Sequence, residues 1–352
     1  MNAQQTGSPQ ITKETKNKIR VEFERTPLKE RLKAKFINMA FVGGVIWYIV
    51  RFVLLLGIAY IVLFPFYTKI AGSFMGRDDF VDVTVRLIPK HPTLDTYKAI
   101  ITDNKYFEAL TNTFILSLTC GLIQMMVCCF VGYGFAKVKF KFNNLLFMLV
   151  IFTMVVPHAT LQLSLFMEFR YFDVLGIVNL LGGGVIDSIN ILESTSINMI
   201  NTNAPLYILS FTGLGFKNGL FIFLMRQFYR GIPDELEESA YLDGSGVFRT
   251  FFSIIIPLSV TMMITIFMFA FCWQWTDNFY TELFFTTTKT VLMPDIIDIP
   301  KSLKTDYAGQ SLYYAAIRNT CGLCIIAPLV ILYLFGQRYL VEGIERSGLT
   351  AE

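Results

Sequence analysis

A few ionisable and amide side chains lie inside long apolar runs of this sequence, and they are the residues that could do chemistry there. Lys217 is the most unusual, because it falls near the middle of its run between Gly213, Gly215 and Gly219. Polar groups are costly at membrane depth, so each such residue is a candidate for a water-filled path through the protein. The set is Asn112, Gln124, His158, Gln162, Lys217, Asn218, Trp275, Asp277 and Asn278.

For a translocation path we select six of these: His158, Gln162, Lys217, Asn218, Trp275 and Asn278. Two interpretations of Lys217 stay open. It donates hydrogen bonds to a hydroxylated substrate, or the glycines break the helix so that its ammonium reaches the membrane interface. His158 is interpreted as a hydrogen-bonded packing residue, in preference to a member of a proton relay. Interfacial anchoring is the default for the aromatic residues near position 275, although aromatic faces also suit sugar rings: Trp273, Trp275 and Phe279.

The second polar feature is the acidic stretch "ELEESAYLDGSG", Glu235 to Gly246. Pro233 is expected in the first helical turn, where the following carboxylates complement the helix dipole. Leu236 and Ala240 form a narrow apolar face, and Asp243-Gly244 predicts a sharp turn, after which Ser245 caps the next helix. A solvated acidic loop is the plain alternative. The small residues at fixed spacing favour a short helix that docks into a groove of another protein.

Catalytic motifs are not found in the sequence. It contains no phosphate-binding loop of the G-x-x-x-x-G-K-[ST] type, no His-Glu metal helix and no Gly-x-Ser-x-Gly elbow. We therefore predict a chain that is not an enzyme, with no metal and no cofactor of its own.

The elements that position these residues are membrane helices. Of the 352 residues, 54% are hydrophobic and 16% are charged. This composition is too apolar for a water-soluble domain. About 20 apolar residues are needed to cross a bilayer as a helix. The fold class is therefore an all-α membrane protein whose six transmembrane helices are predicted at 52–74, 111–136, 145–169, 206–229, 252–275 and 314–338.

Charge sets the expected orientation. Lys and Arg concentrate in the N-terminal tail, the second and fourth connections and the C-terminal end, which all lie on one side of six spans, so this side is predicted to be cytoplasmic. The shorter apolar run from Phe36 to Val50 is expected to lie along the interface. The expected organisation is a cytoplasmic tail and interfacial helix (1–51), a first transmembrane helix (52–74), an external loop (75–110), a core (111–338) with a loop at 230–250, and a cytoplasmic C-terminal tail (339–352).

The acidic stretch resembles the "EAA" loop of ABC importer permeases. That loop reads Glu-Ala-Ala, three residues, Gly, nine residues, Ile, one residue, Leu-Pro. The matching positions here are Glu238, Ser239, Ala240, Gly244, Ile254, Ile256 and Pro257, with Ser239 and Ile256 as mild departures. "TNTFILSLT", "GYGFAKVKFKFNN", "VVPHATLQLSLF" and "QRYLVEGIERSGL" are similar to the sugar-importer branch, in particular to the smaller permease subunit of maltose-type systems.

The resemblance covers about residues 107–346 and implies a type I importer fold. It also implies the partners, which are a second permease subunit, two ATPase subunits that bind the ATP, an extracellular substrate-binding protein and a sugar substrate, with no nucleic acid. The loop of the family docks in a cleft of the ATPase as the coupling helix. Carried onto this sequence, the coupling residues are Glu235, Leu236, Glu238, Ser239, Ala240, Tyr241, Leu242, Asp243 and Gly244.

An ion-gradient-driven secondary transporter is the alternative. It would favour internal repeats and carboxylates deep in the spans, and we find no clear repeat while the acidic residues cluster in loops. Two segments depart from the family pattern. One is the long N-terminal tail, and the other is 181–203, which is either an external loop that contacts the binding protein or a tolerated insertion.

Overall fold

The computed structural model describes residues 39–173, 177, 196–287, 290–306 and 310–348. The chain divides into two compact units, Met1–Thr68 and Lys69–Glu352, which are described separately. The N-terminal tail and most of the 181–203 segment lie outside the described residues, so the predictions made for them are not examined.

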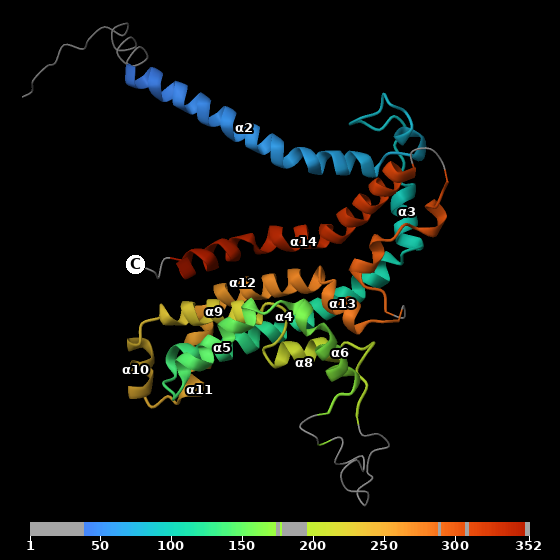
Figure 1. Ribbon diagram of the computed structural model, residues 1–352. Coiled ribbons are helices and arrows are strands. Elements are labelled where there is room, and N and C mark those ends of the chain that lie inside the picture. Colours follow the sequence, from blue (N-terminus) through green and yellow to red (C-terminus); the bar gives the residue numbers. More distant parts are fainter. Residues whose placement is uncertain (1–38, 174–176, 178–195, 288–289, 307–309, 349–352) are drawn as a thin grey trace, which may run out of the picture. The chain divides into compact units, whose positions relative to one another are not determined.

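The described part of the first unit is a single long helix. Helix α2 spans Met39–Ser73 and ends just inside the second unit (Figure 1). It continues through Arg51, so the helix boundary expected at that residue is absent. The side chains from Gly43 to Val62 are all exposed, and they are almost all apolar. An apolar helix of this kind needs lipid or another protein around it, and Gly43–Ser73 is long and apolar enough to cross a membrane.

The described residues of the second unit form helices and turns without a regular strand. The longer helices are α3 (Asp95–Thr102), α4 (Tyr106–Lys137), α5 (Asn143–Val155), α6 (Gln162–Arg170), α8 (Ala204–Phe211), α9 (Asn218–Arg230), α10 (Glu235–Leu242), α12 (Ile256–Trp275) and α14 (Gln310–Gly348). The shorter ones are η1 (Arg77–Phe80), η2 (His158–Leu161), α11 (Val247–Thr250), the π-helical η3 (Phe251–Ile255), α13 (Phe279–Phe284), η4 (Met293–Ile297) and η5 (Lys301–Leu303). The all-α prediction is confirmed.

Two of the six predicted spans are not continuous helices. Within the described residues, four helices are long and apolar enough to cross a membrane. Helix α5 and the following η2–α6 segment meet at a bend of 95°, and the number of spans rises to five if they are counted together as one. The bend follows Pro157, whose ring cannot continue the preceding helix. The predicted span 206–229 is divided into α8 and α9, because positive φ angles at Gly213 and Lys217 break the helix. The count of six therefore stays a prediction.

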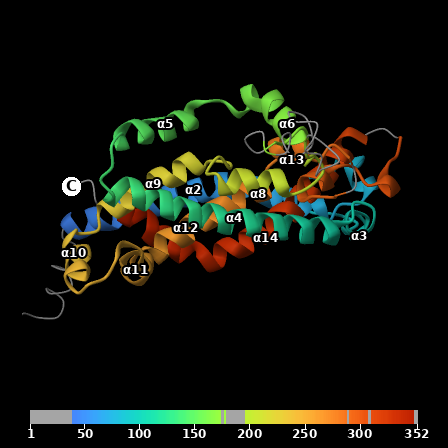
Figure 2. The same cartoon turned by 90° about the horizontal axis from the view of Figure 1, so that it is seen from below.

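Helix α4 lies at the centre of the second unit. Helices α12, α9 and α8 pack along it, α14 packs on α12, and α5 packs on α9 (Figures 1 and 2). The contact between α4 and α9 is close, since a Cβ added at Gly132 would lie 2.6 Å from the Cβ of Met225. Small residues of this kind let membrane helices approach each other, and here they bring the ends of α4 and α9 together.

Alanine at Gly132 is expected to destabilise the protein by about 1–3 kcal/mol, because its methyl group would overlap Met225 and force the two helices apart. Gly134 is the matched control, as an added Cβ there meets nothing within 4 Å. Gly134→Ala should be neutral or gain up to about 1 kcal/mol from helix propensity. Thermal unfolding of the purified protein in detergent measures both, and equal midpoints for the two variants would contradict this packing.

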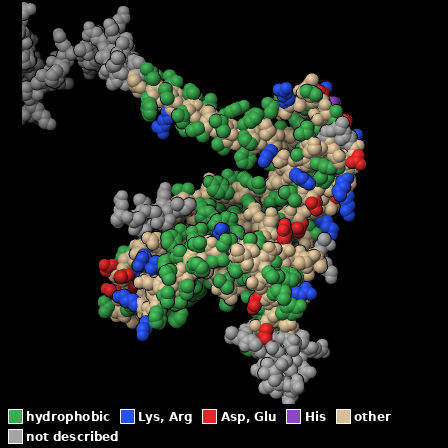
Figure 3. All heavy atoms as spheres, in the orientation of Figure 1, with side chains coloured by type: hydrophobic (Ala, Val, Ile, Leu, Met, Phe, Trp, Pro, Cys, Tyr) green, Lys and Arg blue, Asp and Glu red, His purple; other side chains and the backbone are tan. Residues whose placement is uncertain are grey.

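Charged side chains gather at two ends of the second unit. In Figure 3 acidic and basic side chains cover the region of α10 and α11 at one end and the segments around α3 at the other, with mostly hydrophobic side chains between them. Exposed apolar residues along the intervening helices include Phe114, Ile115, Leu149, Phe152 and Val330. This distribution is typical of two aqueous faces separated by a membrane.

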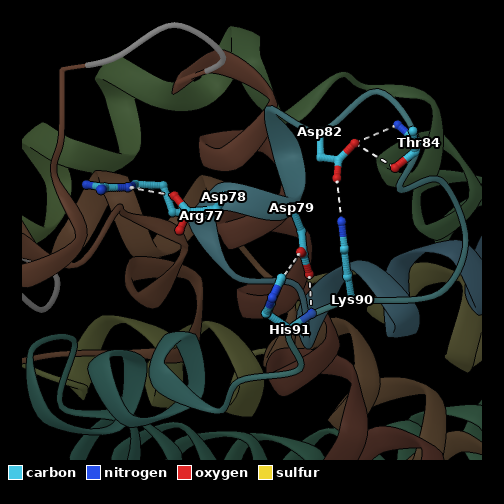
Figure 4. Close-up of polar contacts among 7 residues, drawn as sticks. All are labelled: Arg77, Asp78, Asp79, Asp82, Thr84, Lys90 and His91. Carbon is cyan, nitrogen blue, oxygen red and sulfur yellow. Dashed lines mark hydrogen bonds and ion pairs between the residues drawn. The ribbon is translucent and has the colours of Figure 1, made fainter.

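The segment that follows α2 folds on itself through one buried carboxylate. Met75 and Pro92 form an isolated antiparallel bridge that closes the segment. Within it, Asp79 is 3% exposed and accepts hydrogen bonds from the backbone N–H and the ring Nδ1 of His91, both at 3.2 Å (Figure 4). Asp82 accepts from Thr84 and Lys90 in the same segment.

The stability of this closed segment is expected to depend on pH through Asp79. Burial raises the pKa of the Asp79 carboxyl, but the hydrogen bonds and charge interaction with His91, together with a hydrogen bond from the Lys90 backbone, outweigh burial and hold the pKa below its ordinary value. A lowered pKa means that the stabilisation is complete at neutral pH and is lost as pH falls below about 4. Hydrogen exchange of residues 74–93, corrected for intrinsic rates, should accelerate over that range and, in Asp79→Asn, should be about tenfold faster already at pH 7.

The control for this prediction is the neighbouring Asp78, whose side chain is 91% exposed and only 3.9 Å from Arg77. Asp78→Asn should leave the exchange unchanged, because exposed ion pairs contribute little. Equal acceleration in the two variants would show that Asp79 does not hold the segment closed.

Candidate functional site

The acidic stretch folds into a short helix and a glycine turn. Helix α10 begins at Glu235 after its N-cap Asp234, so Pro233 precedes the cap and does not occupy the first turn as expected. Gly244 has φ +82°, and the Ser245 N–H donates to the carbonyl of Ala240 at 2.9 Å. Side chains other than hydrogen disfavour that backbone conformation. The expected cap at Ser245 is wrong, since α11 is capped by the backbone of Gly246.

The burial of the side chains of α10 differs from the sequence prediction, which placed Leu236 and Ala240 together on a narrow apolar face. Glu237 and Ala240 are 7% and 6% exposed and face the interior of this chain. The Ala240 side chain is therefore covered by this chain in this conformation, and the role predicted for it in contacting an ATPase stays a prediction. Leu242 is 89% exposed, whereas Leu236 and Tyr241 are only partly so, at 40% and 41%. Leu242, the last residue of α10, is therefore the most exposed apolar side chain of this helix.

A buried polar cluster joins the inner face of α10 to the end of α4. The Tyr133 hydroxyl lies 3.3 Å and the Tyr241 hydroxyl 3.5 Å from a carboxylate oxygen of Glu237. Lys137, the last residue of α4, has a side chain that is 6% exposed and an ammonium 3.9 Å from the other oxygen of Glu237. The same ammonium donates to Asp234 and to the Ile232 carbonyl. The first turn of α10 is thus held by one lysine.

The two contacts of Lys137 with carboxylates differ in their exposure to water. The hydrogen bond from Lys137 and then its charge hold the pKa of the Asp234 carboxyl below its ordinary value. The Asp234 side chain is 78% exposed. Water therefore screens this contact. The contact to Glu237 is shielded, because both side chains are less than a tenth exposed.

A second cation fastens the neighbouring helix ends. Arg226 of α9 donates from Nε to the Phe135 carbonyl in the last turn of α4 at 3.4 Å, and its guanidinium lies 3.8 Å from the centre of the Phe147 ring on α5. Arg226 is 9% exposed. Cation–π contacts are stronger when they are desolvated in this way. Together with Lys137, Arg226 connects α4, α5, α9 and α10 at one end of the second unit.

Sequence reasoning missed Tyr133, Lys137 and Glu237 as members of one site. It treated Lys137 only as an orientation signal and Glu237 only as one carboxylate at the start of a helix. The available signal was the spacing of Tyr133 and Lys137, which lie four residues apart and therefore on one face of α4. The pairing with Glu237 joins separate helices, and one sequence carries no signal for it.

The second site is a cavity of about 570 Å³ between α5, η2, α8, α9 and α12. It brings together three of the six residues predicted for a translocation path: His158, Lys217 and Asn218. Aromatic side chains complete its wall. The ring centre of Phe216 is 5.2 Å from that of His158 and 6.0 Å from that of Tyr280, while Trp273 and Tyr280 line the cavity directly.

The other three predicted path residues lie elsewhere. Trp275 is 1% exposed and donates from its indole N–H to the Ile325 carbonyl at 3.0 Å, so it packs α12 against α14. Trp273, two residues earlier, faces the cavity instead. Gln162 lines a separate hollow beside Glu282, and Asn278 is the exposed N-cap residue of α13. The two tryptophans differ because a helix places residues two positions apart on different faces, so the role predicted for Trp275 in the path stays a prediction.

The remaining polar residues within the apolar segments form hydrogen bonds that join elements of the fold. Asn112 donates to the Val291 carbonyl at 3.1 Å, and Gln124 donates to the Ser210 hydroxyl at 3.1 Å. The carboxylate of Asp277 accepts the backbone N–H groups of Tyr280 and Thr281 at 3.1 and 3.2 Å and so begins α13. These groups have structural partners within the chain.

The fold and the two sites are those of an α-helical protein with several helices long and apolar enough to cross a membrane, a cavity among its helices and a short helix at one charged end. The model of the family described as binding-protein-dependent transport system inner membrane component matches residues 128–346, well over half of the sequence. The chain belongs to this family and is a multi-pass protein of the cell membrane.

Individual relatives agree with this assignment. A probable starch degradation products transport system permease protein of Thermoanaerobacterium thermosulfurigenes is 28% identical over 281 residues, which cover 80% of this chain and 89% of the relative. A galactooligosaccharides transport system permease protein of Bacillus subtilis is 25% identical over 300 residues, covering 84% and 93%.

A solved structure shares the fold. It is the crystal structure of a bacterial ABC transporter involved in the import of the acidic polysaccharide alginate, and one of its chains matches with a TM-score of 0.61 and 17% identity. The match covers 84% of this chain and 96% of that one. The predicted resemblance to importer permeases is confirmed.

Proposed function

We propose that this chain is the permease subunit of an ATP-driven importer and translocates a carbohydrate that an extracellular binding protein delivers. The family membership carries this proposal, and the names of the two relatives, for starch degradation products and galactooligosaccharides, support a carbohydrate cargo. The cavity supports it as well, because it combines aromatic faces with hydrogen-bonding groups, as sugar sites do.

The proposed complex contains a second permease subunit, two ATPase subunits and the binding protein. This chain supplies no ATP site and catalyses no reaction. Both of its termini are proposed to be cytoplasmic, together with α10 and α11, which places the 74–93 segment outside the cell. The basic residues that accompany α10, which include Arg226, Arg230 and Arg249, support this orientation.

Coupling is proposed to run through α10. The exposed residues of the loop, with Leu242 at its tip and Glu238 on its outer side, would dock on the ATPase. Closure of the ATPase dimer would displace α10, and the buried cluster of Tyr133, Lys137 and Glu237 would transmit that displacement to α4. Helices that are fastened to each other move as one rigid body, and such a movement would alternate the access of the cavity between the two sides.

The experiment is uptake into proteoliposomes that contain the whole complex, with ATP inside and binding protein with its cargo outside. Uptake should require ATP and should persist when ionophores collapse all ion gradients. Uptake that needs an ion gradient and proceeds without ATP would instead support the secondary transporter.

A further inference from the structure

One charge in the cavity has no counter-charge among the described residues. The Lys217 ammonium lies 5.3 Å from the centre of the Phe216 ring and 6.0 Å from that of Trp273, and none of the ion pairs found in the described part of the chain includes it. The Lys217 backbone has φ 65°. This is the left-handed region that a non-glycine residue rarely adopts. Strained positions of this kind concentrate at ligand sites.

The surroundings of Lys217 add positive potential. It is the N-cap of the 13-residue helix α9, and Asn218 and Gly219 at the start of that helix line the cavity. The positive end of the helix dipole therefore lies at the cavity wall. His158 also lines the cavity, as an imidazole without a formal charge at neutral pH, and the described residues that line the cavity include no aspartate or glutamate. Asp277 does not line the cavity, and its carboxylate accepts the backbone N–H groups of Tyr280 and Thr281 at the start of α13.

Asn218 supplies an independent observation. Its side chain is 1% exposed and lines the cavity, and its Nδ2 donates to the Ser210 carbonyl at 3.4 Å. Its Oδ1 has no hydrogen-bond partner among the described residues. A buried acceptor without a donor is costly. The Oδ1 atom is closed off from solvent, so a ligand hydroxyl would reach it once the Asn218 side chain turned toward the cavity that it lines.

We infer that the cavity receives a carbohydrate carrying a negatively charged group, a carboxylate or a phosphate, which pairs with Lys217. A neutral sugar would offer hydroxyls to Asn218 and ring faces to Trp273 and Tyr280, whereas only an anionic group would also form a charge-assisted hydrogen bond with the ammonium of Lys217, an exposed residue of the cavity wall. An acidic sugar meets all three requirements. This inference rests on the proposed function and names the class of its substrate.

The test measures ligand protection in the reconstituted importer. Leu214 lines the cavity and is 58% exposed, so Leu214→Cys provides a thiol that an uncharged maleimide can label. The probes are digalacturonate for a carboxylate, glucose 6-phosphate for a phosphate and maltose as the neutral sugar. One or both acidic probes should protect the thiol at about tenfold lower concentration than maltose, because a hydrogen bond from the ammonium to a charged group is stronger than one to a neutral hydroxyl.

The matched variants change only the charge. In the Leu214→Cys background, Lys217→Gln should abolish the difference between acidic and neutral probes, and Lys217→Arg should keep it. Labelling rates without probe report whether each variant keeps its fold. Equal protection by maltose would overturn the inference, and this is the result expected if a carboxylate of the partner permease pairs with Lys217. An acidic preference that survives in Lys217→Gln would overturn it as well. ATP-driven uptake measured in the same vesicles tests the proposed function separately, because uptake can persist while the acidic preference is absent.

Discussion

Replacing Lys137 by methionine is expected to lower ATP-driven uptake by roughly tenfold or more while ATP hydrolysis by the assembled complex continues. The change removes the ammonium that holds the first turn of α10 and leaves the Glu237 carboxylate buried without a counter-charge. Breaking a buried ion pair in this way costs about 3–5 kcal/mol. Helix α10 can then move on the ATPase without moving α4, so hydrolysis and transport become uncoupled.

The measurement is uptake and ATP hydrolysis in the same proteoliposomes, expressed as sugar moved per ATP hydrolysed. Lys139 is the matched control, because it is exposed two residues further along. Lys139→Met should retain the normal ratio. An exchange of charges, Lys137→Glu with Glu237→Lys, should recover part of the coupling. A normal ratio in Lys137→Met, with the complex assembled, would contradict the role of this cluster.

The second large effect is expected at the tip of the loop. Leu242→Asp should weaken binding of the ATPase subunits by about 2 kcal/mol or more, because an exposed leucine on a docking helix gains its binding energy from burial in the partner's groove. Its 89% exposure in the free chain means that the fold itself does not depend on it.

Recovery of the ATPase with affinity-purified permease measures this effect across a range of ATPase concentrations. Leu242→Met conserves apolar volume and should bind normally. Val83 provides a control for added charge, since it is 84% exposed and lies in the segment proposed to be external. Unchanged recovery of the ATPase with Leu242→Asp would show that the loop tip is not a docking surface.

Much of this architecture could be predicted from the sequence, because bilayer-length apolar runs and the Asp-Gly turn are local signals. Helix α10 and its turn at Gly244 were predicted almost in place. The interruptions at Pro157 and at Gly213 to Lys217 were harder to predict, since hydropathy averages over residues and continues across a broken helix. At Arg51 hydropathy predicts a boundary that the structure does not have, because arginine is a good helix former and a single one does not end a helix.

The cavity residues show the same limit. His158, Lys217 and Asn218 were selected because they are polar within apolar runs, and in the structure they line one cavity. Trp275 was selected by the same rule and lies outside this cavity, because hydropathy does not tell which face of a helix meets the cavity. Contacts between helices far apart in the sequence, such as that of Lys137 with Glu237, depend on the tertiary arrangement alone.

The central claim is that α10 couples this permease to ATP hydrolysis. The most direct test replaces Glu238 and Gly244 together, as Glu238→Gln with Gly244→Val, and measures ATP-driven uptake by the reconstituted complex. The backbone at position 244 has φ +82°. Valine is strained in that conformation, so the turn must shift, and the outer carboxylate is removed in the same variant. The account predicts that uptake falls close to background. Near-normal uptake with both residues altered would contradict it.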